Sequence, residues 1–266
     1  KDIYEVSLER LNEEQNKGRQ RFNSFYFGRY EELKQIESAI NNFKNNLEFQ
    51  SILISGEAGI GKSALANVVL DNISDQFTLI ETQCYQVEEK YDFRPWKKVI
   101  SDLSYLIKNE ELIDISTWKE VMTLFFPNLE DHLHKEKSFD LAENIPLSRL
   151  SEIISESLNL LSNSKKLILV FEDIQWMDQL SLDLLSSVML NVTSNCMFLL
   201  TSRNEKKRAL DQFTNSLNQC QLLTTIHLKP FTLNETQGFI DKKMPNHSIT
   251  KQGINNVFQH TGVNLF

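Results

Sequence analysis

The chain has 266 residues, of which 41% are hydrophobic and 24% are charged. A composition of this kind can bury a globular core, and it excludes collagen, low-complexity disorder and disulfide-stapled miniproteins. The formal net charge of −8 makes the chain as a whole a poor binder of the phosphate backbone of duplex DNA, because that backbone selects basic surfaces.

Cysteine usage and hydropathy indicate a reducing, aqueous compartment. The three cysteines are far apart and form no CxxC pair, so neither a zinc ribbon nor a disulfide framework is expected. The longest apolar runs have about five residues, against the ~20 needed to span a bilayer. The N-terminus has no apolar signal-peptide segment. We therefore expect a cytoplasmic protein without membrane contact.

The chain begins with two helical patterns. Residues 1–20 carry apolar side chains at helical spacing, and we interpret residues 1–24 as an N-terminal helix with its linker. Residues 29–44 form a clearer amphipathic helix, because their apolar side chains recur on one stripe.

From residue 51 onward, apolar runs alternate with helical patterns. The predicted strands are 51–55, 77–84, 167–171, 197–201 and 222–228. The predicted helices are 62–73, 96–108, 147–162, 179–190, 234–244 and 250–260. This alternation is typical of βαβ units, so the sequence predicts an α/β three-layer sandwich around a five-stranded, mainly parallel sheet. Residues 85–145 hold no convincing strand and are interpreted as a helical insertion.

The pattern changes after the last predicted strand. Lys229, Pro230 and Phe231 end that strand, since proline cannot donate to a ladder. Thr232 and Glu235 then have the spacing of a capping box before two more helices. We therefore expect a core over residues 25–228, followed over 229–266 by the start of a helical lid that the fragment truncates.

A phosphate-binding motif follows the first strand. The residues are Gly56, Glu57, Ala58, Gly59, Ile60, Gly61, Lys62, Ser63 and Ala64, which match GxxxxGK[ST] and open a helix. Glycines let successive backbone N–H groups face phosphate oxygens at a helix N-terminus. Lys62 would reach the β- and γ-phosphates, and the Ser63 hydroxyl would bind Mg²⁺. The pattern indicates a P-loop NTPase.

The strand 167–171 ends in two carboxylates, Glu172 and Asp173. Ligands of parallel sheets sit at the carboxyl ends of the strands. One carboxylate there can hold Mg²⁺ together with Ser63, and the other can polarise the attacking water. Alignment from the strand gives Glu172 the metal position and Asp173 the base position, although both remain candidates for the metal. The chain has no guanine-reading NKxD motif, which favours ATP/ADP over guanine nucleotides.

Several motifs together resemble one family. They are residues 25–33 (FYFGRYEEL), 172–178 (EDIQWMD), 199–203 (LLTSR), 228–231 (LKPF) and 261–266 (TGVNLF). In this order, with the phosphate loop, they are similar to the AAA-type ATPases of the STAND class, signal-transduction ATPases with numerous domains. The bacterial branch in large LuxR-type and antibiotic-regulator-type transcription activators resembles the chain most. The carboxylate pair departs from the family's usual order, in which Asp comes first.

The resemblance implies further roles. Gly28 and Arg29 would lie near the adenine, Pro230 would close over it, and Arg203 would report the γ-phosphate. Phe27 either supplies apolar area to the base or is part of a core. Gln175 is a candidate for orienting water.

Three smaller signals have structural alternatives. Asp178 is interpreted as a helix cap. The run 206–208 (KKR) is interpreted as an exposed helix start, with a contact to nucleic acid or to a neighbouring domain as the alternative. His132 and His134 hint at a metal, but their spacing is poor for one site, and we interpret them as part of a solvated insertion.

The resemblance implies a Mg²⁺- and ATP-binding switch with slow hydrolysis. Its partners would be output and sensor domains outside this fragment, and an ATP-dependent homo-oligomer is possible. Any DNA contact would come through missing domains. The alternatives are a small-molecule kinase, a DNA-stimulated loader-type ATPase, and a nucleotide-bound scaffold that does not hydrolyse.

Overall fold

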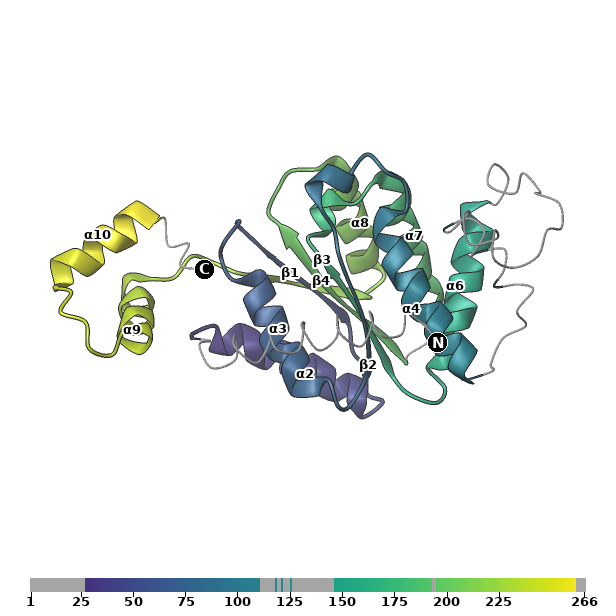
Figure 1. Ribbon diagram of the computed structural model, residues 1–266, viewed down its shortest axis with the longest axis horizontal. Coiled ribbons are helices and arrows are strands. Elements are labelled where there is room, and N and C mark those ends of the chain that lie inside the picture. Colours follow the sequence, from purple (N-terminus) through teal and green to yellow (C-terminus); the bar gives the residue numbers. More distant parts are fainter. Residues whose placement is uncertain are drawn as a thin grey trace, which may run out of the picture.

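The computed structural model describes residues 27–110, 118, 121, 125, 146–192 and 195–261. The predicted N-terminal helix 1–20, both histidines of the metal alternative and most of the motif at 261–266 lie outside the described residues. Figure 1 shows a sheet covered by helices on both faces, with a helix pair set apart at one side.

The elements follow the predicted order. The strands are β1 (Ser51–Gly56), β2 (Thr78–Gln83), β3 (Leu167–Glu172), β4 (Cys196–Arg203) and β5 (Leu223–His227). The α-helices are α2 (Tyr30–Lys44), α3 (Lys62–Ile73), α4 (Arg94–Glu110), α6 (Leu147–Leu161), α7 (Gln179–Asn191), α8 (Arg208–Gln219), α9 (Leu233–Lys243) and α10 (Lys251–Thr261). Each predicted strand, and each predicted helix between residues 29 and 260, is present within a few residues.

Among the described residues the sheet has five strands in the order β2-β3-β4-β1-β5, and every neighbouring pair is parallel. The sheet therefore confirms the predicted α/β class and its parallel strands. Because β4 lies between β1 and β3, the residues after β4 lie between the loop after β1 and the carboxylates after β3.

Alternate residues of the central strands feed two separate cores. Ile52 and Ile54 of β1 pack with α2 and α3 on one face, whereas Leu53 points into the cluster with α4, α6, α7 and α8 on the other. Ile168 and Leu169 of β3 divide in the same way. Both faces are covered, which explains why these strands read as continuous apolar runs.

Helix α8 was not predicted in full; only its first residues were interpreted as a helix start. Its buried side chains are Leu210, Phe213 and Leu217, at helical spacing among polar neighbours. Three buried apolar residues in twelve make a narrow stripe, and the helix follows β4 by a short connection. The apolar stripe of α8 therefore predicts a helix only when the position of the preceding strand, β4, is known.

The C-terminal helix pair, α9 and α10, has a small apolar cluster of its own. Phe231 and Phe239 are buried in it, and Phe27 and Phe258 pack against them. Phe27 precedes α2, so the cluster joins the two ends of the described chain. A Cβ on Gly238 would lie 2.7 Å from Cζ of Phe27, so this glycine makes room for the ring. We call these four phenylalanines the aromatic cluster.

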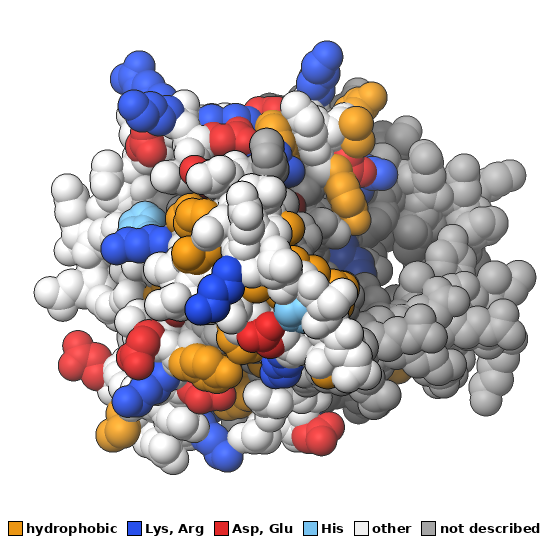
Figure 2. All heavy atoms as spheres, turned by 90° about the vertical axis from the view of Figure 1, so that its left-hand side faces the viewer, with side chains coloured by type: hydrophobic (Ala, Val, Ile, Leu, Met, Phe, Trp, Pro, Cys, Tyr) orange, Lys and Arg blue, Asp and Glu red, His pale blue; other side chains and the backbone are white. Residues whose placement is uncertain are grey.

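The face that carries the helix pair mixes both signs of charge. In Figure 2, Lys and Arg side chains alternate with Asp and Glu side chains over this face. Such a mixture lacks the single-signed basic field that concentrates nucleic acid. None of the helices in the described part of the chain combines the length and apolar character that a membrane span needs.

Candidate functional site

The phosphate loop connects β1 to the N-terminus of α3. Gly59 and Gly61 have φ angles of 72° and 98°, which residues with a Cβ rarely adopt. Gly56 is tightly enclosed, because a Cβ there would lie 3.1 Å from the carbonyl oxygen of Leu228. The glycines of the motif therefore allow a backbone path that other residues would strain. The first turn of α3 follows this path, and the N–H groups of a first turn, which have no partner within their own helix, favour anions.

Lys62, at the start of α3, turns back onto its own loop. Its side chain is buried, and Nζ donates to the carbonyl oxygens of Gly56 at 3.0 Å and Glu57 at 2.8 Å. Burial lowers the pKa of Lys62, and the negative charge of Asp173 opposes this effect. Lys62 and Asp173 are therefore close enough for their charges to interact. From the sequence, this proximity could be expected only by analogy with other phosphate-loop proteins.

The end of β4 lies directly beside the phosphate loop. Arg203 is the register partner of Gly56, and the backbone N–H of Asn204 donates to the Gly56 carbonyl oxygen at 3.2 Å. The Arg203 side chain is partly exposed and lies 3.9 Å from Glu205. The strand order therefore brings the predicted γ-phosphate reporter to the edge of the loop.

The two carboxylates after β3 have different environments. Glu172 is the half-buried last residue of the strand. Asp173 follows it with a φ of 56°, and its backbone N–H donates to Oγ1 of Thr201 at 2.9 Å. Thr201 was not singled out in the sequence. A threonine that is 0% exposed in an apolar strand is the signal that identifies it, because a buried hydroxyl needs a partner.

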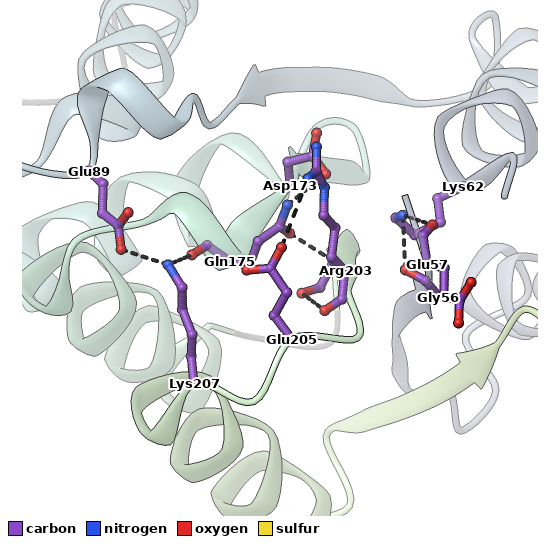
Figure 3. A network of polar contacts seen from close by, with 10 residues as sticks. Gly56, Glu57, Lys62, Glu89, Asp173, Gln175, Arg203, Glu205 and Lys207 are labelled. Atoms are coloured by element: carbon purple, nitrogen blue, oxygen red, sulfur yellow. Dashed lines mark hydrogen bonds and ion pairs between the residues drawn. The ribbon is translucent and has the colours of Figure 1, made fainter. Parts of the chain in front are cut away.

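A polar network surrounds these carboxylates, and Figure 3 shows its members. Gln175 lies in the 3₁₀ turn η3 (Ile174–Trp176), where its side-chain amide contacts both Asp173 and the backbone of Arg203. Lys207 donates to the carbonyl oxygen of Gln175 at 2.8 Å and pairs with Glu89 at 2.6 Å. Helix α8 does begin at this run, and Lys206 and Arg208 are exposed as expected, whereas Lys207 is partly buried and belongs to this network.

Arg29 connects the phosphate loop to the helix pair. Its guanidinium lies 4.5 Å from the ring centroid of Phe231, and its Nη2 is 3.4 Å from the carbonyl oxygen of Ile60. The side chain is buried, and its Nε has no hydrogen-bond partner among the described residues. Gly28 has a φ of 75°, and a Cβ there would lie 3.2 Å from the Phe231 ring. This close packing depends on the glycine.

Two other predicted adenine contacts have different surroundings. Pro230 is exposed at the start of the connection to α9. Phe27 contributes its ring to the aromatic cluster, with centroids 6.5 Å from Phe231 and 6.3 Å from Phe239. These contacts favour the core alternative for Phe27.

The donors available for a metal are oxygens only. Ser63 supplies a hydroxyl, and Glu172 and Asp173 supply carboxylates, which is the chemistry that Mg²⁺ prefers. Within the described residues no group of three or more His, Cys, Asp or Glu side chains comes together. The donor set fits a cation that keeps part of its water shell and shares its remaining positions with phosphate.

The remaining predictions concern packing. Asp178 caps α7, because its Oδ1 accepts from the backbone N–H of Ser181 at 2.8 Å, which confirms that interpretation. Cys84 and Cys196 are free and buried, as expected for small hydrophobes, whereas Cys220 is exposed. Burial raises the pKa of Cys84 and raises that of Cys196 to about 12.

Known structures share this fold. Cdc6p from Pyrobaculum aerophilum matches with a TM-score of 0.52 and 13% identity, over 86% of this chain and 53% of that one. The ORC1 protein of Aeropyrum pernix, solved in complex with DNA, matches with a TM-score of 0.50 and 12% identity, over 84% of this chain and 52% of that one. The chain thus spans about half the length of these proteins. At such identities the likeness shows the P-loop NTPase fold alone. No curated protein matches the chain.

A family model gives the remaining comparison. The model of the AAA ATPase domain matches residues 26–200. This stretch contains the phosphate loop and the acidic end of β3, and it makes up most of the chain. The chain therefore belongs to the AAA ATPase domain family.

Proposed function

We propose that the chain binds Mg·ATP, hydrolyses it slowly, and acts as a nucleotide-dependent switch in a larger bacterial signalling or transcriptional regulator. One observation carries the proposal: the phosphate loop, Arg203 and the carboxylates after β3 meet at the carboxyl edge of one parallel sheet. Ligands of such sheets bind at this edge.

Nucleotide binding begins at the phosphate loop. The glycine-dependent backbone path and the first turn of α3 offer N–H groups to phosphate oxygens. Lys62 exchanges its two loop carbonyls for the β- and γ-phosphates, so its charge, costly to bury alone, gains an anionic partner. The negative charge of a bound phosphate therefore opposes the effect of burial, which lowers the pKa of Lys62.

Magnesium, when bound, would be held by Ser63 and Glu172 and would neutralise phosphate charge. Asp173 accepts a proton from the attacking water, whose oxygen bonds to the γ-phosphorus while the bond to the ADP oxygen breaks. Arg203, beside Gly56, stabilises the charge on the transferred group. We assign the base role to Asp173 because it follows the carboxylate at the metal position, and because hydrogen bonds to Gln175 and Thr201 hold it in place.

The helix pair is the movable part of the switch. Arg29 contacts the phosphate loop through Ile60 and the aromatic cluster through Phe231, so a nucleotide that moves the loop also moves the joint over residues 229–232. Gly28 and Pro230 would line the adenine side of the site. The output would pass to sensor and output domains outside this fragment, or to a neighbouring subunit in an ATP-dependent oligomer.

The first test identifies the bound nucleotide. Freshly purified protein is denatured and the released nucleotide is separated by chromatography, and ATP affinity is then measured for the wild type and Lys62→Ala. We expect co-purified ADP and at least a roughly hundredfold loss of affinity, since charged hydrogen bonds contribute about 1.5–3 kcal/mol each. Lys165→Ala, an exposed lysine at the opposite edge of the sheet, is the matched control. Unchanged ATP affinity in Lys62→Ala would overturn the phosphate-loop assignment.

The second test separates the switch from its alternatives. Phosphate release is measured for the wild type, Glu172→Gln and Asp173→Asn, with and without duplex DNA. We expect slow release that falls in both variants and does not respond to DNA. Stimulation by DNA would favour a loader-type ATPase, and no release above background in any of the three proteins would favour a non-hydrolysing scaffold. ADP that forms only with an added small-molecule acceptor, without free phosphate, would favour a kinase.

A further inference from the structure

Gln175 makes two hydrogen bonds that reach two different strand ends. It is 1% exposed, and a buried amide needs partners for both of its ends. Nε2 donates to Oδ1 of Asp173 at 3.0 Å, and Oε1 accepts from the backbone N–H of Arg203 at 2.9 Å. A single side chain thus joins the carboxylate after β3 to the last residue of β4, as Figure 3 shows.

The carboxylate that Gln175 holds is on a strained backbone. Asp173 has a left-handed φ of 56°, a conformation that residues with a Cβ seldom adopt. Such a conformation persists where the surroundings over-determine it. Two bonds do so here, from the Asp173 backbone to Thr201 and from Gln175 to Oδ1. Among the described residues, Oδ2 of Asp173 has no hydrogen-bond partner and stays available for water.

The turn that carries Gln175 is itself anchored. Lys207 binds the Gln175 carbonyl oxygen and also pairs with Glu89, beyond the end of β2. The ring of Trp176 lies under two cations, 4.6 Å from Nζ of Lys207 and 5.4 Å from the Arg203 guanidinium. These contacts attach the turn to residues 203–207, the segment from which the backbone N–H of Arg203 donates to Gln175. A displacement of Arg203 therefore moves the Gln175 amide as well.

We propose that Gln175 is a positioning residue, which couples the backbone of Arg203 to the orientation of the Asp173 carboxylate. This inference rests on the proposed function. A γ-phosphate that draws Arg203 toward it displaces the Arg203 N–H, and the amide carries that displacement to Oδ1 of Asp173. Water is then activated when the phosphate is in place. The amide groups are occupied by protein, so Gln175 acts through Asp173 and does not itself orient the water.

The test compares two glutamines with the same type of bond. Gln175→Glu keeps the shape and can still accept from Arg203, but it cannot donate to Asp173 and places a second carboxylate beside it. Gln179, on the exposed start of α7, likewise donates from Nε2 to a carboxylate, at 2.8 Å from Oδ1 of Asp183. Gln179→Glu is therefore the matched control.

The readouts are kcat for phosphate release, Kd for ATP, and the unfolding temperature. In Gln175→Glu we expect kcat to fall roughly tenfold to a hundredfold, the loss typical of a misplaced catalytic group, while Kd changes less than about threefold. Gln179→Glu should match the wild type in both. The double variant Asp173→Asn with Gln175→Glu restores a hydrogen bond of reversed polarity. The double variant should regain any unfolding temperature that Gln175→Glu loses, but it should not regain the lost kcat.

The outcomes separate this proposal from the one on which it rests. Wild-type or raised kcat in Gln175→Glu would overturn the positioning role while leaving Lys62-dependent hydrolysis intact. Parallel losses of kcat and ATP affinity, with a lowered unfolding temperature that the double variant does not recover, would make Gln175 merely structural. Absence of Lys62-dependent phosphate release from the wild type would overturn both proposals.

Discussion

The sheet core and the C-terminal helix pair differ in how much apolar packing holds them. In the core, strands that are buried on both faces share two clusters with the helices around them. The helix pair has the aromatic cluster, in which only Phe231 and Phe239 are buried. Large apolar clusters open only near the global unfolding free energy, whereas small ones open at lower cost. The molecule therefore combines a rigid phosphate site with a part that can move for a few kcal/mol.

The largest expected effect comes from the middle of the core. Phe171 is 0% exposed and packs against Trp96, so Phe171→Ala leaves a cavity and should lower the free energy of unfolding by about 3–5 kcal/mol. Urea denaturation followed by tryptophan fluorescence measures it. Leu190→Ala, on an exposed side chain, is the control and should change little. A loss below about 1 kcal/mol for Phe171→Ala would contradict the tight packing on this face.

The corresponding change in the helix pair should be smaller and local. Phe239→Ala removes a ring from the aromatic cluster, and we expect about 1–3 kcal/mol to be lost from the local stability of α9 and α10. Limited proteolysis should then cleave the segment that follows residue 229 faster than in the wild type. The urea midpoint of the core should stay unchanged. Met244→Ala, which is exposed, serves as the control. A lowered core midpoint would show that the two regions unfold as one unit.

The exclusion of water from the core also makes the free energy of unfolding depend on pH. Burial raises the pKa of Cys196 to about 12 from an ordinary value of 9.0. Below pH 9 the thiol is protonated in both states and has no effect. As pH rises from 9 toward 12 the unfolded chain ionises first, so stability falls by about 1.4 kcal/mol per pH unit. The stability difference between the wild type and Cys196→Ala should thus drop by about this amount between pH 8 and pH 10. A difference that stays constant with pH would mean that water reaches the thiol.

The smallest expected effect is at the start of α9. Thr232 and Glu235 form a capping box, with the Thr232 backbone N–H 2.7 Å from Oε2 of Glu235. Thr232→Ala removes the side-chain half of the box and should destabilise α9 by about 1 kcal/mol. Hydrogen exchange of the α9 amides measures the change, and the amides of β3 should stay as protected as before. Equal exchange of α9 in both proteins would show that the cap contributes nothing to this joint.

Much of the core could be predicted because its signals are local. A strand buried on both faces reads as an apolar run, and the phosphate loop is written in consecutive residues. The capping roles of Asp178 and Thr232 likewise depend on neighbours within one turn. For such features the chain order and the spatial order coincide, so no strand pairing has to be known.

The contacts within the site were less accessible for the opposite reason. That Arg203 pairs with Gly56 depends on β4 inserting between β1 and β3, which no single segment encodes. Gln175 was considered only as a group that orients water, because its two partners lie on different strands. The destination of Phe27 was equally open, since its ring meets residues more than two hundred positions later.

The position of Phe27 also determines where mechanical tension goes. Its ring is seated between α9 and the segment that leads to it, against Gly238. A pull on the chain ahead of residue 27 would therefore load the helix pair before it loads the sheet. In the proposed switch, force at one end of the described chain and nucleotide at the phosphate loop would therefore act on the same small aromatic cluster, the first through Phe27 and the second through Arg29.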